Sequence, residues 1–196
     1  MITWQEGEMH RRYALLGLLA SLSAAPALAD GGLKFQYTIE RASGDTVSET
    51  TFLQGFDTRD ALRLKLRLGQ PSYCYVLMSG ENKHFRLAFP DDTRQGLPAN
   101  QWARVPKTTF FRLSEDLGVG RVYIIVARQR VTEIESALAQ GGEAVSETLA
   151  LQVRDRYQGP GSYTRVLDGS TVSVRFQGRS GQPSVVVEEV ALRARE

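Results

Sequence analysis

Residues Leu62–Leu68 read Leu-Arg-Leu-Lys-Leu-Arg-Leu, and this strict alternation decides the fold class. Successive side chains of a β-strand point to opposite faces, so the four leucines share one side. Arg63, Lys65 and Arg67 share the other side. A strand with one apolar and one charged face is typical of an antiparallel sheet that buries only one of its faces.

Several further segments carry the same alternation or an apolar run of strand length. We expect strands at residues 33–39, 72–78, 84–89, 103–112, 121–128, 171–177 and 184–192. Ser79-Gly80-Glu81-Asn82 predicts a hairpin turn between the second and third of these. Gly178 and Gly181 predict another hairpin, between the last two.

Two helices are expected to interrupt the strands. Thr132 and Glu135 fit a capping box that begins a short helix ending near Gln140. Residues 143–157 place an apolar residue at every fourth position, which predicts a helix packed on a sheet; these residues are Val145, Leu149, Val153 and Tyr157. Residues 158–168 are expected to form a loop. The fold class is therefore mainly β, an antiparallel β-sandwich with two short helices.

The first residues predict export. Arg11 and Arg12 precede the apolar run 14–22, and Ala27-Leu28-Ala29 supplies a cleavage pattern after Pro26. We expect a signal peptide over residues 1–29, with Met9 as the true start because Glu6 and Glu8 are unusual in such a segment. Residues 30–196 then form a single domain that is periplasmic or secreted.

Composition excludes several classes of protein. The formal net charge of +2 is too small to indicate a nucleic-acid partner. Cys74 is the only cysteine, so no intramolecular disulfide and no lipid anchor on a cysteine after the signal segment is expected. No later apolar run has the length of a transmembrane segment.

The chain offers few groups for catalysis. His84 is the only histidine after the signal segment, and pairing along the expected hairpin keeps Cys74 away from it. Asp57, Asp60, Asp91 and Asp92 lack the alternation of a calcium loop. We expect no catalytic residue, no metal site and no cofactor. The alternatives are a carboxylate-based hydrolase that uses the loops around Asp57, Asp91 and Asp155, or a small-ligand binder that uses the aromatic strand. A weak calcium site at Asp91-Asp92 also stays open.

The expected contact surface combines two groups of residues. Arg63, Lys65 and Arg67 can face anionic lipid, a glycan or an acidic partner, or can form a solvated face that blocks edge pairing. Tyr73 and Tyr75 share one strand face, either as an aromatic binding surface or as buried residues whose hydroxyls need partners.

The order of motifs over residues 55–128 resembles a bacterial domain of unknown function, the 4384 family. The motifs are Gly55-Phe56-Asp57, Tyr73-Cys74-Tyr75-Val76-Leu77, Ala88-Phe89-Pro90, Val105-Pro106 and Gly120 before the strand at 122–127. Phe56 between Gly55 and Asp57, and Ala88 in place of leucine, depart from the family's pattern. The resemblance implies an exported or envelope-associated β domain with a core at about residues 55–139, and no catalytic residues.

Together these observations predict a non-catalytic exported β-sandwich domain that binds or scaffolds another component of the cell envelope. The expected partner is an envelope protein or a glycan.

Overall fold

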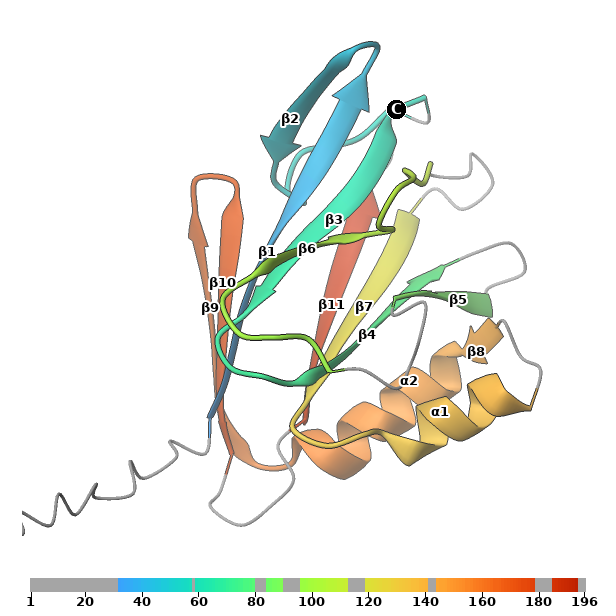
Figure 1. Ribbon diagram of the computed structural model, residues 1–196, viewed down its shortest axis with the longest axis vertical. Helices are drawn as coiled ribbons and strands as arrows, with labels where there is room; N and C mark the ends of the chain where they lie inside the picture. Colours follow the sequence, from blue (N-terminus) through green and yellow to red (C-terminus); the bar gives the residue numbers. More distant parts are fainter. Residues whose placement is uncertain are drawn as a thin grey trace, which may run out of the picture.

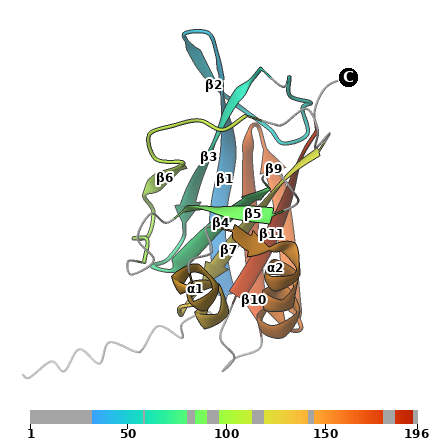
Figure 2. The same ribbon diagram turned by 90° about the vertical axis from the view of Figure 1, so that its right-hand side faces the viewer.

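Two antiparallel sheets and two short α-helices form the described part of the protein, seen in a computed structural model in Figures 1 and 2. The structure describes residues 32–57, 59–79, 84–89, 96–112, 119–140, 144–178 and 185–193. The expected signal segment, Asp91, Asp92 and the centre of the expected turn at residues 80–82 lie outside these ranges.

The first sheet is built around its longest strand, β1, which pairs with β3 on one side and with β10 and β2 on the other. Its strands, in spatial order, are β6 (Trp102–Val105), β3 (Ala61–Leu68), β1 (Gly32–Ser43), β10 (Thr171–Gly178) and β9 (Gly161–Asp168), with β2 (Thr46–Thr50) beside β1. β9 therefore forms one edge of this sheet.

The second sheet has β7 and β4 at its centre. Its strands, in order, are β11 (Val185–Arg193), β7 (Val119–Ala127), β4 (Tyr73–Ser79), β5 (His84–Phe89) and β8 (Ala144–Ser146). The pairing of β4 with β5 shifts register between Val76 and Leu77.

The main core fills the space between the sheets. The four leucines of the opening stretch are at most 3% exposed and pack there, as the alternation predicts. They meet Phe35, Val174 and Phe176 from the same sheet and Cys74, Ile124 and Val190 from the opposite one. The prediction of a mainly β, antiparallel sandwich with two short helices is confirmed.

A second core lies on the other side of the second sheet. The helices α1 (Thr132–Ala139) and α2 (Glu147–Val153) cover this side, as Figures 1 and 2 show. Ile134, Ala150 and Val153 pack there against Tyr75 and Ile125. A π-helical turn, η3 (Arg154–Gln158), continues α2, and the Gln158 side chain accepts a hydrogen bond from the Val187 N–H at 3.4 Å. No helix among the described residues is long and apolar enough to cross a membrane.

Two predictions about strands are wrong. Residues 161–168 form β9 rather than a loop. Among the described strands β9 pairs only with β10, and all eight of its residues are exposed, so its sequence carries no apolar alternation. β10 and β11 do not form a hairpin, because β10 pairs with β1 and β9 while β11 pairs with β7. Both strands turn apolar side chains toward the same core from opposite sheets, so their pattern alone does not distinguish the two arrangements.

Other predictions are partly corrected. The helix expected over residues 143–157 begins with the short strand β8, and residues 106–112 do not continue β6. The helix expected from Thr132 is confirmed, but its N-cap is Val131, with no side-chain cap. Glu135 does not complete a capping box, because its carboxylate accepts a hydrogen bond from the Tyr75 hydroxyl instead. β2 was not expected: its sequence is short and mostly polar.

Candidate functional site

The first sheet turns one of its two faces away from the core, and no described helix covers that face. We call it the outer face. Alternation and register assign it these side chains, among others: Lys34, Gln36 and Glu40 of β1; Glu49 of β2; Arg63, Lys65 and Arg67 of β3; Trp102 and Arg104 of β6; Ser162, Thr164, Val166 and Asp168 of β9; and Ser173 and Arg175 of β10. It carries six cationic side chains and three carboxylates.

Arg63 and Lys65 are neutralised by carboxylates within the outer face. The Arg63 guanidinium donates to Glu40 Oε2 at 2.7 Å through Nε, and the two side chains are only 12% and 6% exposed. Lys65 Nζ lies 2.5 Å from Glu49 Oε1. These two members of the predicted stripe therefore bind their own sheet, and little of Arg63 is open to a partner.

Arg67 differs from its two neighbours in having a neutral partner. Its Nε donates to Gln36 Oε1 at 3.0 Å, and Gln36 Nε2 in turn donates to Ser173 Oγ at 3.0 Å. The guanidinium carbon also lies 5.2 Å from the centre of the Trp102 ring, within the range of a cation–π contact. Gln36 and Trp102 therefore orient the Arg67 guanidinium, and neither of these two neighbours is a carboxylate that would neutralise its charge.

A cleft of about 420 Å³ opens beside Arg67. Lys34 and Arg175 lie directly opposite each other on β1 and β10 at this cleft, and both side chains are exposed. The described residues that line it are Lys34, Phe35, Gln36, Arg67, Gly69, Asn100, Thr164, Val166, Ser173, Val174 and Arg175, with three cations and no carboxylate.

Tyr73 and Tyr75 lie on the other sheet and face the helices. Tyr75 is 1% exposed; its hydroxyl donates to Glu135 Oε1 at 2.8 Å and accepts from the Val131 N–H at 3.2 Å. Burial raises the pKa of this phenol. Tyr73 is half-buried, with the Arg130 guanidinium 5.7 Å from its ring centre. The structure thus does not bring the two tyrosines together with the cationic stripe, and it places Tyr75 beneath α1, out of a partner's reach.

Cys74 and His84 are separated by the register of their strands. Ser79 pairs with Phe85, the residue after His84. Cys74 therefore lies five residues, or about 16 Å, along β4 from the position opposite Phe85, and His84 lies one residue further along β5. The Cys74 thiol is buried, and burial raises its pKa to about 12, so it stays protonated and unreactive at neutral pH.

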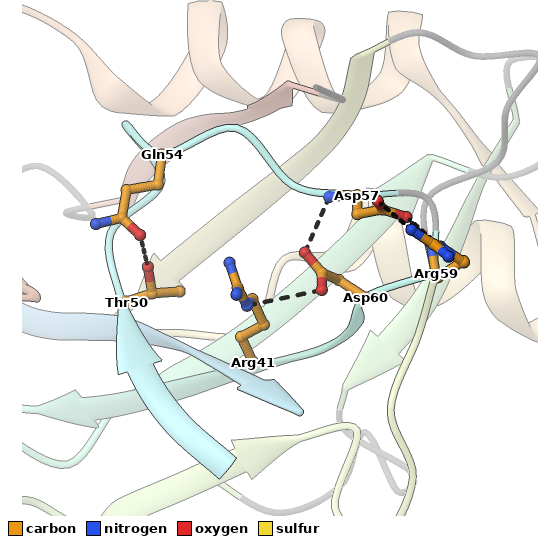
Figure 3. Close-up of polar contacts among 6 residues, drawn as sticks. All are labelled: Arg41, Thr50, Gln54, Asp57, Arg59 and Asp60. Atoms are coloured by element: carbon orange, nitrogen blue, oxygen red, sulfur yellow. Dashed lines mark hydrogen bonds and ion pairs between the residues drawn. The ribbon is translucent and has the colours of Figure 1, made fainter. Parts of the chain in front are cut away.

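The carboxylates near Asp57 are held by local contacts, which Figure 3 shows. Asp57 Oδ1 accepts from Arg59 Nε at 3.0 Å, and Asp60 Oδ2 accepts from the Asp57 N–H at 2.9 Å. Asp60 also lies 3.6 Å from Arg41 Nε, and Thr50 donates to the Gln54 side chain at 2.6 Å. These contacts order the loop that precedes β3.

Phe56 explains why that loop is ordered. Its side chain is fully buried in the main core, and its N–H donates to the Arg193 carbonyl at 2.8 Å. The Gly55-Phe56-Asp57 motif therefore ties the entry of β3 to the end of β11 in the opposite sheet.

The three carboxylates of the hydrolase alternative are not brought together. Asp57 and Asp155 are each paired with a neighbouring arginine, Arg59 and Arg154, and line different cavities. Asp91 lies outside the described residues. Among the residues that the structure describes, no three His, Cys, Asp or Glu side chains gather as metal ligands.

One buried carboxylate was missed by the sequence analysis. Glu188 of β11 is 3% exposed and turns toward the first sheet, where it accepts from Tyr37 at 2.7 Å and from Tyr163. Arg165 Nε lies 3.2 Å from the same carboxylate. Burial raises the pKa of Glu188 to about 7, and the Tyr37 hydrogen bond only partly opposes this. All its contacts are internal, so it joins β1 and β9 to β11.

The cleft residues Lys34, Gln36 and Arg175 were also missed. Alternation within residues 33–39 already places Lys34 and Gln36 on a polar face. The missing information was that β10 lies beside β1, which brings Arg175 opposite Lys34.

Comparison with family models, with curated proteins and with solved structures finds no match to this chain.

Proposed function

We propose that this protein is a non-catalytic, exported domain that binds an acidic component of the bacterial cell envelope through the outer face. The observation that carries the proposal is the excess of cationic side chains on a sheet face that no described helix covers. Three of its members, Arg104, Lys34 and Arg175, are exposed, so a partner can reach them.

Export is the second part of the proposal, and it is supported by the sequence of residues 1–29, which has the three zones of a signal peptide. The envelope location is supported by that segment and by the resemblance to the domain of unknown function 4384 family. Binding rather than catalysis is supported by the local pairing of Asp57 and Asp155 and by the buried thiol of Cys74.

Trp102 adds an exposed aromatic ring to the outer face, and such rings are common in binding surfaces. Its ring is 39% exposed, and Lys65 and Arg67 lie 4.9 and 5.2 Å from its centre. Aromatic and arginine side chains together are enriched in the residues that contribute most to protein interfaces. Trp102 lies on the edge strand β6 directly opposite Arg67, and Arg67 in turn lines the cleft.

Retention of envelope extract on the immobilised protein tests the proposal. We expect the wild-type protein to retain an acidic component that elutes between about 0.15 and 0.5 M salt, because screening weakens exposed charge pairs. The Lys65→Gln/Arg104→Gln variant removes two cations of the outer face and is expected to retain several-fold less. Arg104 lies 3.3 Å from Glu40, but Glu40 keeps Arg63 as its partner, and Glu49 is exposed to water. We therefore expect this variant to fold as the wild type does.

The matched control is Lys107→Gln/Arg193→Gln, which removes the same charge from two exposed positions outside the cleft and the outer face. This control is expected to retain as much as the wild type. Equal retention by both variants, or none by the wild type, contradicts the proposal.

A further inference from the structure

We infer that β9 pairs antiparallel with β9 of a second copy of this chain, so that two molecules form a dimer with one continuous first sheet. β9 lies at an edge of that sheet, and all eight of its residues are exposed. Every second residue of an edge strand turns its N–H and C=O away from the sheet, where another strand can bind them. The inference goes beyond the proposed function, which needs only the outer face of one molecule.

The other described edges of the two sheets are protected against such pairing. Proteins keep edge strands short, place proline or charge on them, or cover them. β6 and β8 have only four and three residues, and β2 has five residues with Glu49 among them. β11 is long, but its Val187 N–H donates to the Gln158 side chain. Its Arg193 carbonyl accepts from the Phe56 N–H, so η3 and the loop before β3 cover this edge.

β9 has none of these protections. It contains no proline and no lysine, and its register with β10 runs unbroken from Gly161 to Asp168. The charged residue at its middle, Arg165, is held by contacts within the molecule: Nε lies 3.2 Å from Glu188 Oε1, and Nη2 donates to the Tyr37 hydroxyl at 3.0 Å. Figure 1 shows the β9–β10 hairpin at the left margin of the molecule. An edge of this kind is a template for a further strand.

β9 also carries exposed apolar side chains. Tyr163, Val166 and Leu167 are 39%, 53% and 41% exposed, and they are three of the six large apolar side chains exposed among the described residues. Tyr163 and Leu167 share one face of the strand, and Val166 lies on the other. A second strand beside β9 therefore removes apolar surface from water on both faces of the sheet.

The sequence of β9 is complementary to itself in an antiparallel register. A twofold axis perpendicular to the sheet relates the two strands and keeps both outer faces on the same side. With this axis at residue 165, Tyr163 lies opposite Leu167 of the second copy, and Thr164 lies opposite Val166. A shift of the register by two residues would instead place Leu167 opposite Gly161, which has no side chain to contact it.

The size of this interface predicts a weak dimer. Each copy contributes eight residues, whereas a stable interface takes roughly 20–30 from each side, so we expect a dissociation constant in the micromolar range. Pairing takes place in the plane of the sheet and leaves the side chains of the outer face uncovered. The two outer faces then lie side by side, and a partner with repeated acidic groups can bind both at once.

Sedimentation velocity from about 1 µM to about 1 mM protein tests the inference. At about pH 8 Glu188 is ionised and Arg165 keeps its counter-charge. We expect the wild type to change from monomer to dimer over this range. Val166→Lys/Leu167→Lys places a cation on each face of the edge and should weaken the dimer at least about tenfold.

The matched control is Val47→Lys/Leu53→Lys, which makes the same substitutions at two apolar side chains that are 51% and 68% exposed away from β9. This control should dimerise as the wild type does. A protein that stays monomeric at every concentration, or an equal effect of the two variants, overturns the inference. A monomer would leave β9 to an extended segment of another protein.

Cysteine crosslinking tests the register independently of any loss of stability. In an oxidised mixture of Thr164→Cys and Val166→Cys, the two cysteines face each other across the axis, within the Cα separation that a disulfide spans. Each variant alone places its cysteines diagonally, about 7–8 Å apart, and should form far fewer crosslinks. Cys74 is buried and does not compete. Equal crosslinking of the mixture and the separate variants contradicts the register.

The dimer and the proposed function fail separately. Envelope extract retained by a monomeric protein leaves the proposed function in place and overturns the pairing. A dimer that retains no envelope component leaves the pairing in place and contradicts the proposed function.

Discussion

At the scale of single residues, Glu188 has the most altered acidity among the described carboxylates. It lies in the main core, 3% exposed, between the two sheets, and burial raises its pKa to about 7. The charged and titratable groups around it are Tyr37, Tyr163 and Arg165 from the first sheet, with Glu189 as its neighbour on β11. Its protonation is therefore linked to the stability of the fold.

The sign of this linkage follows from the direction of the shift. Between pH 4.5 and 7 the folded protein holds a proton on Glu188 that the unfolded chain has already lost. The free energy of unfolding should thus decrease by up to about 3 kcal/mol as the pH rises through this range. Above pH 7 Glu188 should cause no further change in the free energy of unfolding.

Urea unfolding of the Glu188→Gln variant at several pH values measures this contribution. A glutamine cannot ionise, so the decrease between pH 4.5 and 7 should be smaller than in the wild type. The control Glu49→Gln alters an exposed carboxylate paired with Lys65 and should keep the wild-type slope. The same slope in Glu188→Gln as in the wild type would mean that another group is responsible.

At the scale of elements, Tyr75 connects the second sheet to α1. Its hydroxyl is the partner of both Glu135 and the N–H of Val131, the residue that caps the helix without a side-chain hydrogen bond of its own. Tyr75→Phe should reduce the free energy of unfolding by about 1–2 kcal/mol, because it leaves a buried N–H without its acceptor. Tyr73→Phe changes a half-buried phenol on the same strand face and should cost less than about 0.5 kcal/mol. Chemical denaturation of both variants checks this, and an equal loss in the two would contradict the role given to Tyr75.

The elements also show what the sequence can and cannot predict. β3 and β5 were predicted within one residue, because Leu62–Leu68 alternates strictly and residues 84–89 are bounded by turn residues. β9 was missed because it is exposed on both faces, so burial leaves no pattern in its sequence. The false hairpin of β10 and β11 arises because alternation reports which side of a strand is buried and carries no information about the neighbouring strand.

The same limit applies to the candidate site. The common face of Arg63, Lys65 and Arg67 could be predicted from alternation within one strand. The partners of these three side chains could not be predicted, because they come from other strands. The partners are Glu40 for Arg63, Glu49 for Lys65 and Gln36 for Arg67. The burial of Tyr75 by α1 is likewise a consequence of packing between distant segments.

At the scale of the whole molecule, the two sheets have different surroundings. The second sheet is covered on one side by the main core and on the other by α1 and α2, while the outer face of the first sheet has no described helix over it. The domain, which we propose to be exported, thus has one side covered by helices and one cationic side without a described helix over it, and this asymmetry suits it to bind a partner in a single orientation. The central claim is therefore that the outer face, and not the helix side, contacts the envelope partner.

Photo-crosslinking in living cells tests this claim most directly. A photoreactive amino acid is placed at Ser162, an exposed position of β9 on the outer face, or at Gln152, an exposed position of α2 on the helix side. We predict that the exported protein forms an adduct with an acidic envelope component from position 162 and none from position 152. An adduct from position 152 alone, or a protein that remains in the cytoplasm and forms none, would contradict it.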